Sequence, residues 1–207
     1  MTMKKLLLLT LIPALGFASV SNGPYAGLEA GISNQIDIFN SGTAYNQNNS
    51  PTYASNQAFL MRLNAGYNFS KYSGLELGGT YNFGTSVPYP NSSAANMNIQ
   101  ATTLDFSLLL YLPTTVDSLS VFGRVGGAYD WLNGSGGCNC NGTTAPGGGA
   151  FTDVLGAGVK YNVTSKTSFR LEWISNGLFF PVEISNGSTN TASWTNQTFM
   201  LGFNLHF

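Results

Sequence analysis

This 207-residue sequence contains few charged residues and a single histidine. Only 8% of its residues are Asp, Glu, Lys or Arg, against about 25% in an ordinary soluble domain. The formal net charge of -1 gives no electrostatic reason to expect nucleic-acid binding. His206, the only histidine, lies at the chain end, so the loops hold no base that could activate a nucleophile. We therefore predict a protein that is not an enzyme and needs no cofactor.

Cysteine is also scarce. Cys138 and Cys140 are the only two, separated by one residue within a glycine-rich stretch. In an oxidising compartment they could form a small, strained disulfide ring, and pairing between two chains is the alternative. Two thiolates without a nearby histidine are too few for a zinc site, so we predict no bound metal.

Long apolar runs are absent after the first 18 residues, which argues against a transmembrane helix. The beginning of the chain has the order of a secretory signal peptide. Lys4 and Lys5 precede an apolar segment at 6–15, and Gly16 and Ala18 supply small residues before a cleavage point. We predict that 1–18 is removed as a signal peptide and that 19–207 forms one domain.

What the sequence does contain is alternation of apolar and other residues, clearest at the end of the chain. Phe199, Leu201, Phe203, Leu205 and Phe207 occupy every second position up to the last residue. This period indicates a strand with one apolar face. In a soluble protein such a terminal edge would recruit other strands. A strand that closes a barrel and turns its apolar face to lipid would show this pattern without that risk.

Seven further segments alternate in the same way. With the terminal strand they cover 25–34, 59–69, 74–83, 98–112, 119–131, 151–163, 167–176 and 197–207. The connections at 35–56, 84–97, 133–150 and 177–195 are long and polar, whereas those at 71–72, 113–118 and 164–166 are short. Even strand number with alternating long and short connections predicts an all-β fold, an eight-stranded antiparallel up-and-down transmembrane β-barrel.

Most charged residues of the strands share the face opposite the apolar one. A charge within a membrane must face protein or water and find a partner, so we predict a paired network inside the barrel. Its members would be Glu29, Arg62, Glu76, Asp105, Arg124, Lys160, Arg170 and Glu172. Asp153 is the exception, on the lipid-side parity beside a long loop.

Aromatic residues gather near the strand ends, as membrane interfaces favour. We predict one belt from Tyr25, Phe69, Tyr161, Phe169 and Phe207, and a second from Phe59, Phe83, Trp131 and Phe151.

The signal peptide, eight strands, inward charges and terminal Phe207 together resemble the OmpA-type transmembrane domain and the small OmpX and OmpW groups. The resemblance implies a monomer in the lipid of the bacterial outer membrane. It also implies that the barrel assembly machinery recognises the strand ending in Phe207. No residues remain for the periplasmic domain of full-length OmpA, so cell-wall tethering is not implied.

Three functions fit this pattern. The first is an outer-membrane protein whose loops act in envelope integrity or adhesion, with a host or surface molecule as ligand. The second is a narrow OmpW-like channel or conduit for small hydrophobic molecules. Its basis is a set of glycines on the inward parity: Gly27, Gly31, Gly66, Gly78, Gly126, Gly156 and Gly158. The third is a soluble lipocalin-like carrier with the opposite sidedness, which the low charge content disfavours.

One segment breaks the loop pattern. Residues 178–182 are apolar where a polar loop is expected. We expect them to cover the base of the last hairpin, and the alternative is an exposed patch that binds a partner.

Overall fold

The computed structural model describes residues 22–40, 52–88, 96–116, 118–136, 147–179, 182–185 and 191–207. Within these ranges the chain forms strands and the short turns between them. The strands are β1 (Gly23–Asn40), β2 (Thr52–Ser70), β3 (Ser73–Pro88), β4 (Asn96–Pro113), β5 (Leu119–Gly136), β6 (Gly147–Asn162), β7 (Thr167–Asn176), β8 (Val182–Ser185) and β9 (Thr191–His206).

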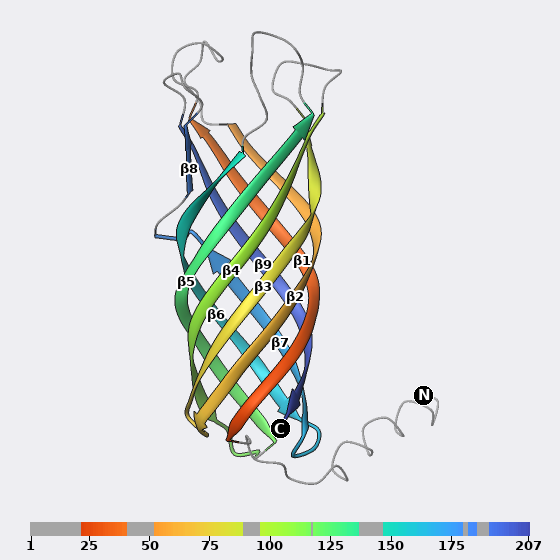
Figure 1. The fold of residues 1–207 in the computed structure, drawn as a ribbon, viewed down its shortest axis with the longest axis vertical. Coiled ribbons are helices and arrows are strands. Elements are labelled where there is room, and N and C mark those ends of the chain that lie inside the picture. Colours follow the sequence, from red (N-terminus) through yellow and green to blue (C-terminus); the bar gives the residue numbers. More distant parts are fainter. Residues whose placement is uncertain are drawn as a thin grey trace, which may run out of the picture.

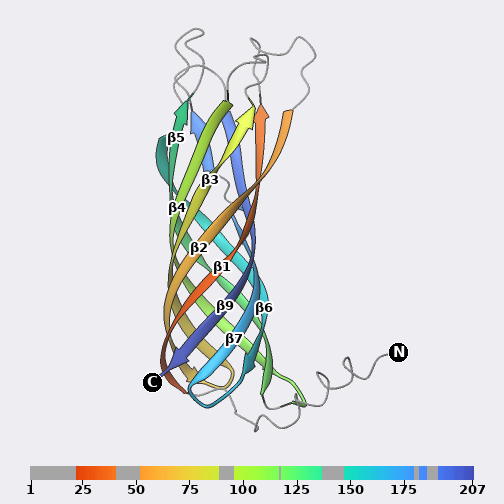
Figure 2. The same cartoon turned by 90° about the vertical axis from the view of Figure 1, so that its right-hand side faces the viewer.

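Each long strand pairs antiparallel with its sequence neighbour, and β9 also pairs with β1. The sheet therefore closes on itself, as the two perpendicular views show (Figures 1 and 2). β8 pairs only with β9, beyond the end of the β7–β9 ladder, so it continues the line of β7. Eight strands thus surround the axis, which confirms the predicted up-and-down barrel. Within the described ranges, no helix is long and apolar enough to cross a membrane.

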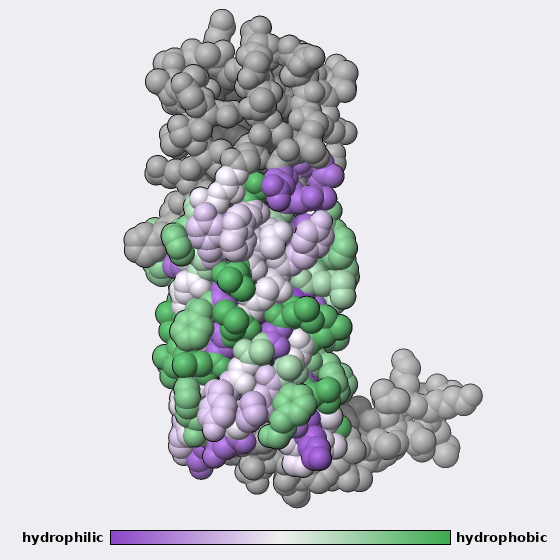
Figure 3. Space-filling view, viewed as in Figure 1, coloured by the Kyte–Doolittle hydropathy of each residue, from purple (hydrophilic) through white to green (hydrophobic). Residues whose placement is uncertain are grey.

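The barrel is apolar outside and charged inside. Leu63, Leu171 and Leu201 are exposed on the outer wall, whereas Arg62, Arg124 and Arg170 are buried in the interior. Figure 3 shows apolar residues over the middle of one face and strongly hydrophilic residues at its lower end. This sidedness confirms the membrane orientation and is the reverse of what a soluble carrier requires.

The strands are longer than the alternating segments. β2 has 19 residues, which corresponds to about 65 Å along the strand and about 45 Å of height at a tilt of about 45°. A bilayer core is about 30 Å thick. The wall therefore extends well beyond the apolar zone, and parts of 35–56, 84–97, 133–150 and 177–195 that we expected to be loops are strand.

The ends of the barrel differ in their connections. β1 begins and β9 ends at the same rim, where Tyr25 pairs with His206. The short connections lie at that rim and are tied to the adjacent strands: the Tyr111 amide donates to Tyr72 O at 2.8 Å, and the His206 amide donates to Lys166 O at 2.8 Å. The strand ends that border the predicted long loops lie at the opposite rim (Figure 1).

The seventh strand is interrupted. The β6–β7 ladder ends at Val154 and Asn176, where Gly177 adopts a φ of 75°. Leu178 and Phe179 then turn away from the wall and are 48% and 67% exposed. For these two residues the expectation that the segment covers the hairpin base is therefore wrong, and 180–181 lie outside the described residues. The seventh barrel strand resumes as β8, which pairs with β9 from Val182.

Candidate functional site: the filled interior of the barrel

Three arginines and four carboxylates meet in the middle of the barrel, drawn from β1–β5 and β7. All their side chains are at most 2% exposed. We call this set the central ion cluster: Glu29, Arg62, Glu76, Asp105, Arg124, Arg170 and Glu172. It brings together every predicted member of the charge network except Lys160.

Glu76 is the hub of the central ion cluster. Its carboxylate accepts hydrogen bonds from Arg62 Nη2 at 3.0 Å, from Arg170 Nη1 at 2.6 Å and from Arg124 Nη2. The Tyr25 hydroxyl donates a further bond of 2.7 Å to the same carboxylate. One side chain on β3 thus joins β1, β2, β5 and β7 across the lumen.

The other carboxylates complete the pairing around the hub. Arg124 Nε donates to Glu172 at 2.6 Å, and Arg170 Nη2 lies 3.0 Å from the Glu172 carboxylate. Asp105 accepts from Arg62 Nη2 at 3.0 Å and from Arg124 Nη1 at 3.2 Å, and Glu29 accepts from Arg170. Every guanidinium therefore has at least two carboxylate partners, which buried charges require.

Lys160 lies apart from the central ion cluster. Its Nζ is 5.6 Å from the centroid of the Tyr25 ring and 5.5 Å from that of Tyr111. No carboxylate within the described residues forms an ion pair with it. The faces of these two aromatic rings are its neighbours, an arrangement that favours a cation.

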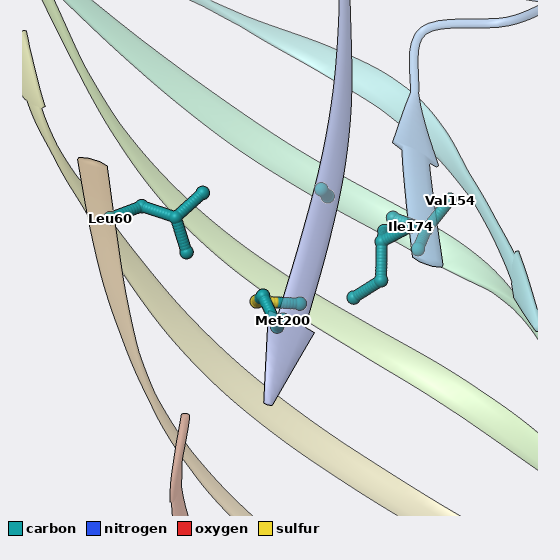
Figure 4. Close-up of a cluster of buried hydrophobic side chains, with 5 residues drawn as sticks. Leu60, Val154, Ile174 and Met200 are labelled. Carbon is teal, nitrogen blue, oxygen red and sulfur yellow. The ribbon is translucent and has the colours of Figure 1, made fainter. Parts of the chain in front are cut away.

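Apolar layers close the lumen above and below the charges. On the loop side, Leu60, Val154, Ile174 and Met200 point into the lumen and pack with Ala128 (Figure 4). On the short-turn side, Tyr25, Leu109, Tyr111 and Phe122 form a second buried cluster. Three successive levels of side chains therefore fill the barrel, as expected for eight strands.

At three inward glycines, a side chain of another residue occupies the space that a Cβ would fill. A Cβ on Gly78 would lie 2.0 Å from Arg62 Nη2, one on Gly66 would lie 2.4 Å from the Tyr25 ring, and one on Gly158 would lie 2.5 Å from the Phe122 ring. These glycines allow the plugging residues to cross the lumen, rather than leaving a path through it.

Tyr25 was predicted to face lipid in the aromatic belt at the short-turn end. This is wrong, because its side chain is buried inside the barrel. It shares the parity of Glu29, and that parity was the signal that should have placed it inward. Of the other belt residues, Phe69, Phe169 and Phe207 at the short-turn end and Phe59, Phe83, Trp131 and Phe151 at the loop end are exposed, and Tyr161 is half-buried.

Among the described residues, the single histidine is not joined with a serine and a carboxylate into a catalytic set. His206 lies inside the rim and its Nε2 is 3.0 Å from Ser168 Oγ, but Ser168 is fully buried and no carboxylate is bonded to the imidazole among the described residues. The predicted Cys138 and Cys140 pair and most of the surface loops lie outside the described residues, as does the segment 1–18.

Comparison with known proteins identifies the family of the chain. The family model described as "Outer membrane protein beta-barrel domain" matches residues 5–207. Among curated proteins, no sequence matches at a significant level.

Solved structures share the architecture at low identity. The chain is similar to the outer membrane protein OprG from Pseudomonas aeruginosa, at 13% identity and a TM-score of 0.60 over 91% of this chain and 98% of that chain. It is also similar to Neisserial surface protein A, at 13% identity and a TM-score of 0.56 over 89% and 97%. A third is the outer membrane protein AlkL, at 10% identity and a TM-score of 0.52 over 92% of each chain. At these identities the likeness shows the fold alone.

Proposed function

The chain belongs to the outer membrane protein beta-barrel domain family and resides in the bacterial outer membrane, and from this premise we propose that it is a closed barrel that holds surface loops in place. In this role the barrel is an anchor, and the loops act at the cell surface in adhesion or envelope integrity. The observation that supports the proposal is the central ion cluster, in which three guanidinium groups and four carboxylates cross the lumen with almost no solvent exposure.

The conduit hypothesis is less well supported. It depended on space left by inward glycines, and the positions next to Gly66, Gly78 and Gly158 are taken by the side chains of other strands. Opening a path would require separating buried ion pairs, and removing one partner of such a pair costs about 3–5 kcal/mol.

Conductance of a planar lipid bilayer tests the proposal. We expect purified, folded protein to leave the membrane silent, with a general porin in the same bilayer as positive control. Long-lived, reproducible channels from folded wild-type protein would overturn the closed-barrel function and restore the conduit.

Assays on bacterial strains can distinguish a role in adhesion from a role in envelope integrity. The matched strains would express wild-type protein, no protein, and a variant with the connection at 137–146 shortened, which leaves every described strand intact. Loss of cell binding with normal detergent resistance in the shortened variant favours adhesion. Detergent sensitivity only in the strain without protein favours a structural role of the barrel itself. Wild-type behaviour of all three strains in both assays would contradict either role.

Assembly is proposed to proceed through the end of β9. Phe207 is exposed at the rim, and its amide donates to Pro24 O at 3.0 Å, so it closes the barrel seam between β9 and β1. We propose that the barrel assembly machinery binds this strand and that the product is a monomer. Deleting Phe207 should lower the amount in the outer membrane while purified protein still folds in detergent, and equal amounts in the membrane would contradict the role.

A further inference from the structure

A groove lies on the outer wall near the loop-side ends of β4, β5 and β6. It has a volume of about 510 Å³, within the range of about 300–1,000 Å³ that ligand pockets occupy. Thr102, Trp131 and Gly149 are direct cross-strand neighbours and form one row across it. The lining is Thr102, Trp131, Leu132, Asn133, Gly148 and Gly149.

Glycine on β6 is what opens the groove beside Trp131. At Gly148 an added Cβ would meet nothing within 4 Å. At Gly149 it would lie 2.4 Å from the Tyr129 hydroxyl, so that ring leans over the missing side chain. Tyr129 packs edge-on against both Trp131 and Phe151, with centroids 4.6 and 4.8 Å apart. The groove is therefore bordered by a fixed group of three aromatic rings.

The height and chemistry of the groove indicate what occupies it. Trp131 is 42% exposed and Phe151 80% exposed in the outer aromatic belt, where acyl chains give way to headgroups. Leu104, two residues below Thr102 on the same face of β4, and Val125, lower on β5, are exposed on the lipid-facing wall, so the groove borders that wall. None of the described residues that line it is charged, so these residues supply no cation to bind a phosphate. An indole face and the hydroxyl and amide groups of Thr102 and Asn133 suit a sugar ring, whose C–H faces stack and whose hydroxyls form hydrogen bonds.

We propose that this groove binds an outer-leaflet glycolipid, with a headgroup sugar stacked on Trp131 and the acyl chains along the apolar wall below. The outer leaflet of the bacterial outer membrane consists largely of glycolipid, so the ligand is abundant at this height. This binding would keep a glycolipid molecule beside one side of the barrel. It does not depend on what the loops bind or on whether the lumen conducts.

The test is lipid retention by the folded full-length barrel. Protein would be placed in phosphatidylcholine nanodiscs that contain equal amounts of deep-rough lipopolysaccharide and phosphatidylglycerol, and retained lipids would be counted by native mass spectrometry. We expect wild type to retain the glycolipid at least fivefold over phosphatidylglycerol, whose headgroup carries a phosphate and no sugar.

Exposed positions supply variants that leave the barrel interior untouched. W131A and N133L should each reduce glycolipid retention at least fivefold, and W131F should restore most of it. W173A removes a half-buried indole on β7, away from the groove, and should retain as much glycolipid as wild type. The proposal is overturned if wild type shows no preference for the glycolipid. It is equally overturned if W131A and N133L both bind as wild type does, or if W173A loses as much as W131A.

Discussion

Removing the hub carboxylate should destabilise the barrel more than any other single change to its interior charges. E76A leaves three buried guanidinium groups without one of their partners and the Tyr25 hydroxyl without its acceptor. Breaking a buried ion pair by removing one partner costs about 3–5 kcal/mol. Because the remaining carboxylates still pair with each arginine, we expect a loss within that range rather than three times larger.

Equilibrium unfolding in urea, with the protein folded in phospholipid vesicles, measures this loss. With a slope of about 2 kcal/mol per M, a loss of about 4 kcal/mol lowers the midpoint by about 2 M. D130A is the matched control, since Asp130 is a buried carboxylate of the same lumen that accepts from the hydroxyls of Thr103 and Thr152 instead of from arginines. Its loss should be smaller, about 1–3 kcal/mol.

A double-mutant cycle tests whether the energy comes from the ion pairs. Arg170 donates to both oxygens of Glu76, at 2.6 and 3.1 Å. R170A in the E76A background should therefore cost less than in wild type, by about 1–3 kcal/mol. Additivity within about 0.5 kcal/mol, or an E76A midpoint no lower than that of D130A, would refute the reasoning.

Three further outcomes follow from the sidedness, the packing and the leader. L63R, in the middle of the lipid-facing wall, should lower stability in vesicles by about 2–4 kcal/mol. F59R, in the aromatic belt at the loop end, should lower it by only about 0–1 kcal/mol, and equal effects would contradict the assigned depth. In the same urea assay, G78A should cost about 1–3 kcal/mol because its methyl group meets the Arg62 guanidinium. The outward G79A, whose methyl group meets nothing within 4 Å, should change stability by no more than about 0.5 kcal/mol. Protein isolated from outer membranes should begin at Ser19 by intact mass, and retention of 1–18 would disprove the predicted cleavage.

The strand number and sidedness were predictable because lipid and lumen impose opposite demands on alternate residues. Phe199, Leu201 and Phe203 repeat with the period of the pleat, and the intervening positions are inward in the structure. The strand ends were not predictable in this way. Beyond the lipid a strand no longer needs an apolar outer face, so alternation is not required there, while ladder hydrogen bonds between backbones continue regardless of side chain.

Parity also predicted which charges face inward, but not which of them touch. Contacts across a lumen depend on strand tilt and stagger, which the sequence of one strand does not encode. Arg62 on β2 reaches Glu76 on the adjacent β3 and Asp105 on β4, two strands away, whereas Lys160, on the same inner face, lies one level lower among tyrosine rings. For Tyr25, position near a strand end predicted the lipid-facing side, whereas its parity with Glu29 matches its buried position in the lumen.

Two residues that looked anomalous in sequence belong to one feature of the seventh strand. Asp153 has lipid-side parity, and Phe179 is an apolar residue in an expected polar loop. In the structure the Phe179 amide donates to Asp153 Oδ1 at 3.0 Å, and the Gly177 amide donates to Asp153 O at 3.0 Å. The carboxylate thus supplies an acceptor where the β6–β7 ladder stops, at the level of the outer aromatic belt. An acidic residue is tolerated on this face because it satisfies backbone donors that lipid could not.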